Sequence, residues 1–521
     1  METIQKNTAA LSAAVRAYRE AMLADPYRPT WHFAVPDDNG YPGDPNGAFY
    51  ADGRYHLMYL YRNTAKGAFH WGHISSSDLL HWRHHPDALE GDEGDEGCFS
   101  GGAFVDDDGI AYLTFWKFPS KGEHPKDNGG IGMAKAYPPY EHWERMEPVA
   151  LEESEWGILD VERDGEILHL GCADPSNIWK SGDLYYMQTG NLCVLNKYGR
   201  NEDSDPAYRG DHTDLFRSRD LSHWEYVGRF YENPHTDADY PDDTEDDMCP
   251  EFLPLPDSAG GGKMTDRYLQ LFIAHNRGAQ YYTGMWDAEH ERFLPETHGR
   301  FSWRDSACFA PESLIDGKNR QLAWFWFRDD PEKAVETYGW TGVYSFPRTL
   351  WLENGILHMA PAEELAFLLS HRQDMDAFRL AGGEEKALCL HDPHSFRLYA
   401  EISAADAETG FAVLADADER TDIFYDASAG KLILDASQSG ADGWKCREEA
   451  LFRLAEGEKL ILEILVDHSV IEVYANGRQA IARRVFPKNP EQAAGVLAFS
   501  RGGEAAFETL TIHTVEPANP C

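Results

Sequence analysis

Five segments of the 521-residue chain share one pattern, in which a short strand leads through a turn rich in Gly and Asp into a second, aromatic strand. They are DPNGAFYADGRYHLMYLY (44–61), SGGAFVDDDGIAYLTFW (100–116), DPSNIWKSGDLYYMQTG (174–190), CPEFLPLPDSAGGGKMTDRYLQLFI (249–273) and APESLIDGKNRQLAWFWF (310–327). Their starts lie 56 to 75 residues apart, which is the length of a four-stranded blade with its loops. The repeat therefore predicts a five-bladed β-propeller.

Different patterns flank the repeat. Residues 3–24 have the periodicity of an amphipathic helix, and we expect its apolar face to pack against the main domain. That face carries Leu11, Val15, Tyr18 and Met22. Residues 394–515 alternate apolar and polar positions and contain the hairpin signal Asn476-Gly477, which is typical of a β-sandwich.

The expected fold class is all-β, with a short helix at the N-terminus. A chain of 521 residues exceeds what one hydrophobic core usually supports, so we expect more than one domain. The predicted order is an N-terminal helix (1–26), a propeller that carries the active site (27–365), a linker (366–393) and a β-sandwich (394–521).

Composition limits the classes of partner. The formal net charge of −42 would repel nucleic acid and anionic membrane surfaces, so we expect neither as a partner. The acidic runs 91–97 and 237–247 lack the spacing of a calcium loop, and the eight cysteines form no CxxC pair, which argues against metal sites and a disulfide framework. With no leader-like or membrane-spanning stretch in the sequence, we expect a cytoplasmic protein.

Two carboxylates stand at equivalent positions of the repeat. A propeller brings the first strand of every blade to the central channel, so Asp44 and Asp174, which each open such a strand before a proline, are expected to share one pocket. Like charges in one pocket cost stability, which favours a functional use. Retaining glycoside hydrolysis uses an ionised carboxylate as nucleophile, together with a second acid that protonates the leaving oxygen.

At this point the residues show a family resemblance. The stretch WHFAVPDDNGYPGDPNGAFYADGRYHLMYLY (31–61) resembles the opening of glycoside hydrolase family 32, which contains invertases, fructanases and sucrose-phosphate hydrolases. Further similar segments follow in the family's order: WGHISSSDLLHW (71–82), CFSGG (98–102), ADPSNIW (173–179), MCPEF (248–252), GWTGVYSFPRTLWL (339–352) and VDHSVIEVYANGRQ (466–479). The resemblance covers both large domains and implies a propeller followed by a sandwich.

The resemblance also implies roles for single residues. Asp44 falls on the family's nucleophile and Asp174 on its transition-state stabiliser. The residues expected to contact the sugar are Asn46, Trp71, Phe99 and Ser100. For Trp71 the alternative is packing in the propeller core.

The general acid has two candidates, because the family's acid directly precedes Cys-Pro and this chain has Met248 there. Glu245 resembles the acid of a divergent branch and is our first candidate, with Glu251 as the alternative. Asp246 and Asp247 are expected to be loop charges.

The predicted function is hydrolysis of terminal β-fructofuranosides, such as sucrose or short fructo-oligosaccharides, through a covalent fructosyl-aspartate and without a cofactor or metal. Gly43 and Ala173 replace an Asn and an Arg of the family, which leaves room for fructosyl transfer or for another furanoside such as an arabinofuranoside. A non-catalytic sugar-binding homologue remains the alternative of another class. The strand starts offer few Lys or Arg for a phosphorylated substrate, and the sequence leaves the oligomeric state, a homo-oligomer included, open.

Overall fold

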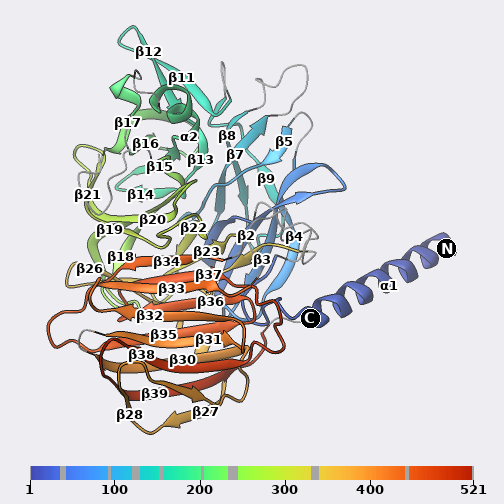
Figure 1. Cartoon of the computed structure of the whole chain (residues 1–521). Coiled ribbons are helices and arrows are strands. Elements are labelled where there is room, and N and C mark those ends of the chain that lie inside the picture. Colours follow the sequence, from blue (N-terminus) through green and yellow to red (C-terminus); the bar gives the residue numbers. More distant parts are fainter. Residues whose placement is uncertain are drawn as a thin grey trace. The chain divides into compact units, whose positions relative to one another are not determined.

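Strands dominate the structure, a computed structural model (Figure 1). It describes residues 2–35, 43–91, 95–119, 129–151, 156–200, 203, 205–209, 211–232, 245–329, 340–404, 407–440 and 445–518. The chain forms two compact units, one of residues Val35–Glu364 and one that joins Met1–Ala34 to Leu365–Cys521.

The unit of residues 35–364 consists of antiparallel blades. The first is β1 (Pro45–Ala51), β2 (Arg54–Asn63), β3 (Ala68–Ser76) and β4 (Arg83–Leu89). The second is β5 (Asp95–Cys98), β6 (Ala103–Val105), β7 (Ala111–Pro119), β8 (Gly130–Ala136), β9 (Trp143–Arg145) and β10 (Ala150–Leu151), followed by the hairpin β11 (Ile158–Arg163) and β12 (Glu166–Gly171). The third is β13 (Ala173–Pro175), β14 (Trp179–Ser181), β15 (Leu184–Gly190), β16 (His212–Ser218) and β17 (Trp224–Glu232).

Two more blades complete this unit. The fourth is β18 (Met248–Pro256), β19 (Met264–Ala274), β20 (Gly278–Asp287) and β21 (Arg292–Arg300). The fifth is β22 (Cys308–Ile315), β23 (Gln321–Phe327), β24 (Val343–Tyr344), β25 (Arg348–Glu353) and β26 (Ile356–Pro361). The innermost strands close a ring, since β1 contacts both β6 and β22, and β18 contacts both β13 and β22. The five-bladed propeller expected from the repeat is confirmed.

Packing between neighbouring blades explains the aromatic second strands of the repeat. Phe49 and Trp71 of the first blade share a buried cluster with Phe115 of the second, and Phe230 of the third blade packs with Phe252 of the fourth. Within the third blade, a short helical segment connects β15 to β16; it consists of α2 (Leu192–Val194), a π-helical turn (Leu195–Gly199) and a 3-10 turn (Pro206–Tyr208). Burial of these large rings stabilises the contact between adjacent blades.

The other unit contains a sandwich of two antiparallel sheets, as expected. One sheet has the order β27 (Leu369–Met375), β39 (Ala505–Val515), β30 (Ser395–Ala404), β35 (Leu460–Asp467), β36 (Val470–Ala475) and β37 (Gln479–Arg484), with β28 (Phe378–Leu380) also paired to β39. The other has the order β29 (Glu385–Leu388), β38 (Gly495–Arg501), β31 (Glu408–Ala415), β32 (Arg420–Asp426), β33 (Lys431–Gln438) and β34 (Arg447–Leu451).

The expected linker 366–393 is not a linker. After a 3-10 turn (Glu363–Leu368), the segment supplies β27, β28 and β29 to the sandwich. Their partners β38 and β39 lie more than a hundred residues later in the chain, so the local pattern does not reveal the pairing. Residues 27–34 also group with the sandwich rather than the propeller, and the backbone N–H groups of Thr30 and Trp31 donate to Asp467.

Helix α1 (Glu2–Ala24) forms where the periodicity predicts it. Leu11, Val15 and Tyr18 of its apolar face are exposed, and packing of this face against the main domain stays a prediction. Helical periodicity is a local property, whereas docking needs a complementary surface elsewhere. No helix among the described residues is long and apolar enough to cross a membrane.

Candidate active site

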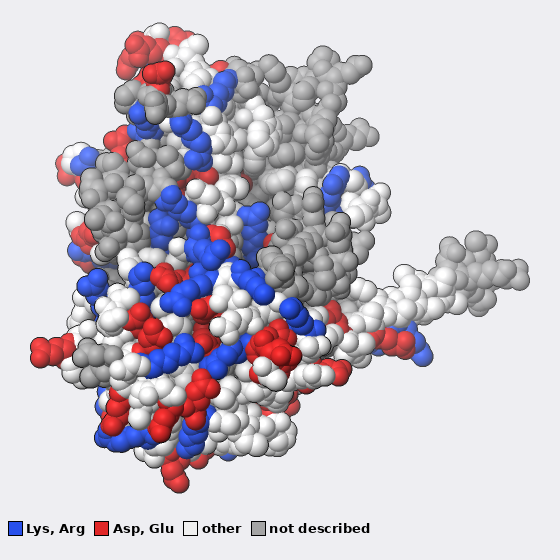
Figure 2. Space-filling model, viewed as in Figure 1, with Lys and Arg blue, Asp and Glu red and all other residues white. Residues whose placement is uncertain are grey.

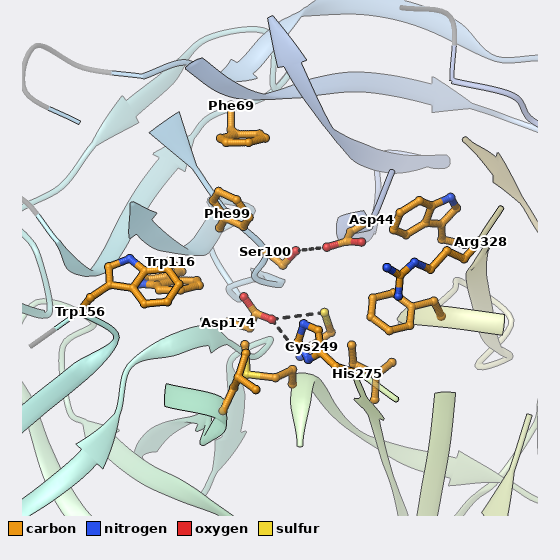
Figure 3. A pocket seen from close by; sticks show the side chains of 15 residues that line it. Asp44, Phe69, Phe99, Ser100, Trp116, Trp156, Asp174, Cys249, His275 and Arg328 are labelled. Carbon is orange, nitrogen blue, oxygen red and sulfur yellow. Dashed lines mark hydrogen bonds between the residues drawn. The ribbon is translucent and has the colours of Figure 1, made fainter. Parts of the chain in front are cut away.

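A cavity of about 270 Å³ lies where the innermost strands of the blades begin (Figure 3). All five blades contribute to it. Its lining consists of Asp44, Phe69, Phe99, Ser100, Trp116, Trp156, Asp174, Leu192, Met248, Cys249, Ile273, His275, Phe309, Trp326 and Arg328.

Irregular backbone at the strand starts aims side chains into this cavity. The ladders of β13, β18 and β22 each shift register at the residue before a proline. That residue has a positive φ in each strand: 45° for Asp174, 48° for Cys249 and 32° for Ala310. Such a bulge turns a side chain out of the regular alternation, and strained φ values of this kind gather at functional sites.

Asp44 directly precedes β1 and is buried. The hydroxyl of Ser100 donates to its Oδ2 at 2.7 Å, whereas Oδ1 has no hydrogen-bond partner among the described residues. Its backbone carbonyl accepts hydrogen bonds from the side chain of Asn46 and the amide of Leu60, which fix the residue in place. Burial raises the pKa of Asp44, against the opposing effects of the Ser100 hydrogen bond and the nearby His275 and Arg328.

Asp174 lies in the same cavity. Its Oδ2 accepts hydrogen bonds from the backbone N–H of Cys249 at 3.3 Å and from the thiol of Cys249 at 3.4 Å. Burial, and after it the negative charge of Asp44, raise the pKa of Asp174 to about 7. The two carboxylates expected to converge therefore lie close enough to affect each other's protonation.

The residues expected to contact the sugar divide into three groups. Phe99 and Ser100 line the cavity. Asn46 lies deeper and is fully buried, where it bonds the backbone of Asp44 and Gly101. Trp71 is completely buried between the first two blades, against Phe115, and does not reach the cavity. The core alternative for Trp71 is thus the observed one, because its position in β3 faces the neighbouring blade.

Neither glutamate considered for the general acid lines the cavity. The carboxylate of Glu245 lies 3.3 Å from both Arg277 and Arg300 and accepts a hydrogen bond from Gln280. Glu251 lies beneath the cavity among the innermost strands, where burial raises the pKa of its carboxyl and of the neighbouring Glu312. Glu245 accepts a hydrogen bond from Arg277, and Glu251 accepts one from the backbone N–H of Asn177.

An aromatic wall forms one side of the cavity, and sequence reasoning found only Phe99 among its members (Figure 3). The ring of Phe99 lies 4.5 Å from that of Phe69 and 5.6 Å from that of Trp116, and Trp116 lies 5.0 Å from the half-exposed Trp156. Flat rings of this kind can stack on the apolar faces of sugars. Trp116 lies in β7, the second strand of its blade, which returns antiparallel to the same end of the channel where the first strand starts.

Two cationic side chains on the other side of the cavity were also missed. His275 follows β19 and Arg328 follows β23, so both stand at the end of a second strand. The guanidinium of Arg328 lies 5.0 Å from the ring centre of Phe309 and donates to Ser306. In an antiparallel pair, the second strand ends beside the start of the first. Because the first strands start at the cavity, the residues that follow the second strands are expected there too, and this pairing could have identified His275 and Arg328 from the sequence.

A metal site is not apparent at the cavity. Within the described ranges, the group of side chains with metal-ligand spacing is His70, Asp87 and Glu90, and none of them lines the cavity. Its members already have partners, since Asp87 accepts hydrogen bonds from His70 and Tyr61, while Glu90 pairs with Lys66.

Comparison with family models identifies both halves of the chain. Residues 32–361 match the N-terminal domain of glycosyl hydrolases family 32, and residues 372–514 match the C-terminal domain of the same family. Together the two matches cover most of the sequence.

Individual relatives agree with these matches. A sucrose-6-phosphate hydrolase of Zymomonas mobilis is 26% identical over 99% of this chain and 97% of its own length. A levanase of Bacillus subtilis is 25% identical over 94% of this chain and 70% of its own length. Among solved structures, a fructan 1-exohydrolase IIa of Cichorium intybus superposes with a TM-score of 0.78 at 21% identity, covering 95% of this chain and 98% of that one, which shows the shared fold.

Proposed function

Since the chain belongs to glycoside hydrolase family 32, we propose that it hydrolyses terminal β-fructofuranosides, such as sucrose or short fructo-oligosaccharides, with retention of configuration. One observation carries the proposal. Asp44 and Asp174 enter one cavity, and Asp44 has one carboxylate oxygen held by Ser100 while the other has no partner in the part of the chain that the structure describes. A nucleophile needs this combination of a fixed position and an available lone pair.

In the proposed reaction Oδ1 of Asp44 attacks the anomeric carbon of the fructosyl unit. A covalent fructosyl-aspartate forms, and water then hydrolyses it. Asp174 accepts hydrogen bonds from sugar hydroxyls and stabilises the positive charge that develops on the ring in the transition state. Arg328 and His275 favour the ionised form of Asp44, since both lower the pKa of its carboxyl.

The cavity supports a small sugar as substrate. A volume of about 270 Å³ is at the small end of the range for ligand pockets, and Phe99, Trp116 and Trp156 offer apolar faces. Arg328 supplies the cation that the strand starts lack, so a phosphorylated disaccharide belongs among the candidate substrates. Sucrose 6-phosphate, after which the Zymomonas relative is named, is such a molecule. None of the seven described cysteines forms a disulfide, which fits the cytoplasmic location expected from the sequence.

The test is release of fructose from sucrose, sucrose 6-phosphate, 1-kestose and a short levan, with arabinofuranosides as the competing class. Asp44→Asn should lower kcat by at least about 10³-fold, and the wild type should accumulate a fructosyl adduct on Asp44 that mass spectrometry detects. Asp107→Asn is the matched control, because Asp107 is exposed and pairs with Lys180 away from the cavity. Full activity of Asp44→Asn would contradict the proposed nucleophile.

The same reactions separate the alternatives. Products longer than the substrate would indicate fructosyl transfer instead of hydrolysis. Binding without turnover of any of these sugars would leave a sugar-binding homologue, and release of arabinose but not fructose would reassign the substrate.

A further inference from the structure

The cavity holds a nucleophile but lacks a second carboxylic acid in the usual place. Met248 occupies the position that carries the acid in the resemblance, and a thioether cannot donate a proton. Among the described residues that line the cavity, the carboxyl groups are those of Asp44 and Asp174. A sugar alkoxide is a poor leaving group, so cleavage of sucrose needs a proton from another side chain.

His275 has the geometry for this task. Its ring lines the cavity, and its Nδ1 lies 3.3 Å from Oδ1 of Asp246. The carboxylate of Asp246 also accepts the backbone N–H of His275 and a hydrogen bond from Arg200, so the buried acid is fixed on both sides. Nε2 has no partner among the described residues, and the half-exposed ring is accessible from the cavity.

His275 follows the strand that pairs with Met248, the residue at the family's acid position. Met248 pairs with Ile273 across β18 and β19, and both residues line the cavity. His275 follows two residues after Ile273 and lines the same cavity. A side chain from the neighbouring strand therefore reaches the region that Met248 leaves without an acid (Figure 3).

We propose that His275 is the general acid and base of this enzyme, with Asp246 as its positioning residue; the proposal rests on the fructosidase function. In the first step Oδ1 of Asp44 bonds to the anomeric carbon, the bond from this carbon to the leaving oxygen breaks, and Nε2 of the imidazolium gives that oxygen its proton. In the second step neutral Nε2 takes a proton from water, whose oxygen displaces the Asp44 carboxylate. The enzyme returns to its starting protonation state.

The charges around the ring suit this role. Burial lowers the pKa of His275, but the hydrogen bond to Asp246 and the charges of Asp246, Asp174 and Asp44 outweigh it, so the pKa lies above 6.5. This direction favours the protonated imidazole, which can donate a proton, and the neutral form can accept one. The other charged group facing the cavity is Arg328, which opposes this effect.

Asp174 is the competing proton donor, because the pKa of its carboxyl is about 7. Its Oδ2 is occupied as an acceptor by the amide and thiol of Cys249, which favours the ionised form and a binding role. If His275 is the acid, His275→Gln should retain activity toward a substrate that needs no protonation. If Asp174 is the acid, Asp174→Asn should retain it instead.

The test compares sucrose with p-nitrophenyl β-D-fructofuranoside, whose phenolate leaves without a proton. His275→Gln should lower kcat/KM for sucrose by about 10²–10⁴-fold but that for the aryl fructoside by less than about tenfold. Gln keeps an amide that can bond Asp246. His290→Gln is the matched control, because His290 is exposed in the turn between β20 and β21 and bonds only Asp287.

Two further variants separate catalysis from folding. Met248→Glu in the His275→Gln background returns a carboxyl to the family's acid position. The double variant should have a kcat/KM for sucrose at least about tenfold higher than that of His275→Gln alone. Asp246→Asn should move the basic limb of the kcat/KM profile for sucrose to lower pH, because the group that must stay protonated then loses the charge that raises its pKa. A purely structural role would lower activity equally at every pH.

The outcomes separate the fructosidase function from the assignment of His275 as its acid. If the wild type turns over neither substrate, the fructosidase function and the acid both fail. If the wild type cleaves sucrose and Asp44→Asn does not, but folded His275→Gln keeps sucrose activity, only the acid assignment is overturned. Equal losses on both substrates in His275→Gln, with selective loss on sucrose in Asp174→Asn, would transfer the acid to Asp174.

Discussion

At the scale of single residues, the cavity places two carboxyl groups where ionisation is costly. Asp174 is buried, its Oδ2 has only the amide and thiol of Cys249 as donors, and Asp44 shares the cavity. Proteins tolerate such an arrangement where the charge is used in chemistry. The loss of folding stability that this ionisation causes can be measured separately from enzymatic activity.

We expect Asp174→Asn to stabilise the protein at alkaline pH. The pKa of Asp174 is about 7 in the folded chain, against an ordinary value of 3.8. As pH rises through this window the unfolded chain loses the proton first, so folding stability falls, and the loss is complete above the folded pKa. Asn removes this effect, which amounts to at most about 4 kcal/mol near pH 8 and vanishes near pH 3.

Thermal unfolding by calorimetry at several pH values checks this prediction, with the exposed Asp107→Asn as control. A stability difference between Asp174→Asn and the wild type that does not change with pH would contradict the raised pKa.

At the scale of secondary-structure elements, the sequence pattern indicated the first two strands of each blade but did not single out the residues that follow the second strand. The repeat identified Asp44 and Asp174, because equivalent strand starts must converge in a closed ring. His275 and Arg328 stand just beyond the second strands, in segments with no shared pattern. Trp156 lies outside the repeat altogether, so its place in the cavity depends on tertiary packing that a single sequence does not reveal.

Strand β3 gives a test of core packing against sugar binding. Trp71 is fully buried and its Nε1 has no hydrogen-bond partner. We expect Trp71→Phe to cost a modest part of the stability and Trp71→Ala about 3–5 kcal/mol, with KM for the substrate unchanged in whatever fraction stays folded. Denaturant titration and steady-state kinetics check this; a raised KM at unchanged stability would instead return Trp71 to the binding site.

Helix α1 gives the opposite expectation. Its apolar residues Leu11, Val15 and Tyr18 are exposed, and Met22 is only partly buried. Removal of residues 1–24 should therefore leave the unfolding midpoint and kcat/KM within error of the full chain, since the described side chains of this helix bury little apolar area. A clear drop in the midpoint would indicate that the face packs in solution, as the periodicity alone predicts.

At the scale of the whole molecule, acidic side chains greatly outnumber basic ones, 89 against 47. The C-terminal unit carries interspersed basic and acidic side chains (Figure 2). Several of them pair on the sheet that contains β32 and β33, among them Arg420 with Asp422 and Lys431 with Glu449. Exposed pairs of this kind contribute little each, so they do not offset the net charge of −42.

We therefore expect the protein to unfold at a higher temperature as salt is added. Self-repulsion in a chain of net charge −42 destabilises the compact state, and raising ionic strength from about 0.01 M to about 0.15 M shortens the screening length from about 30 Å to about 8 Å. Sodium chloride and choline chloride should raise the unfolding midpoint equally, because screening depends on ionic strength and not on the cation. If a divalent cation at low concentration raised the midpoint while choline chloride did not, a specific cation site rather than general repulsion would limit stability.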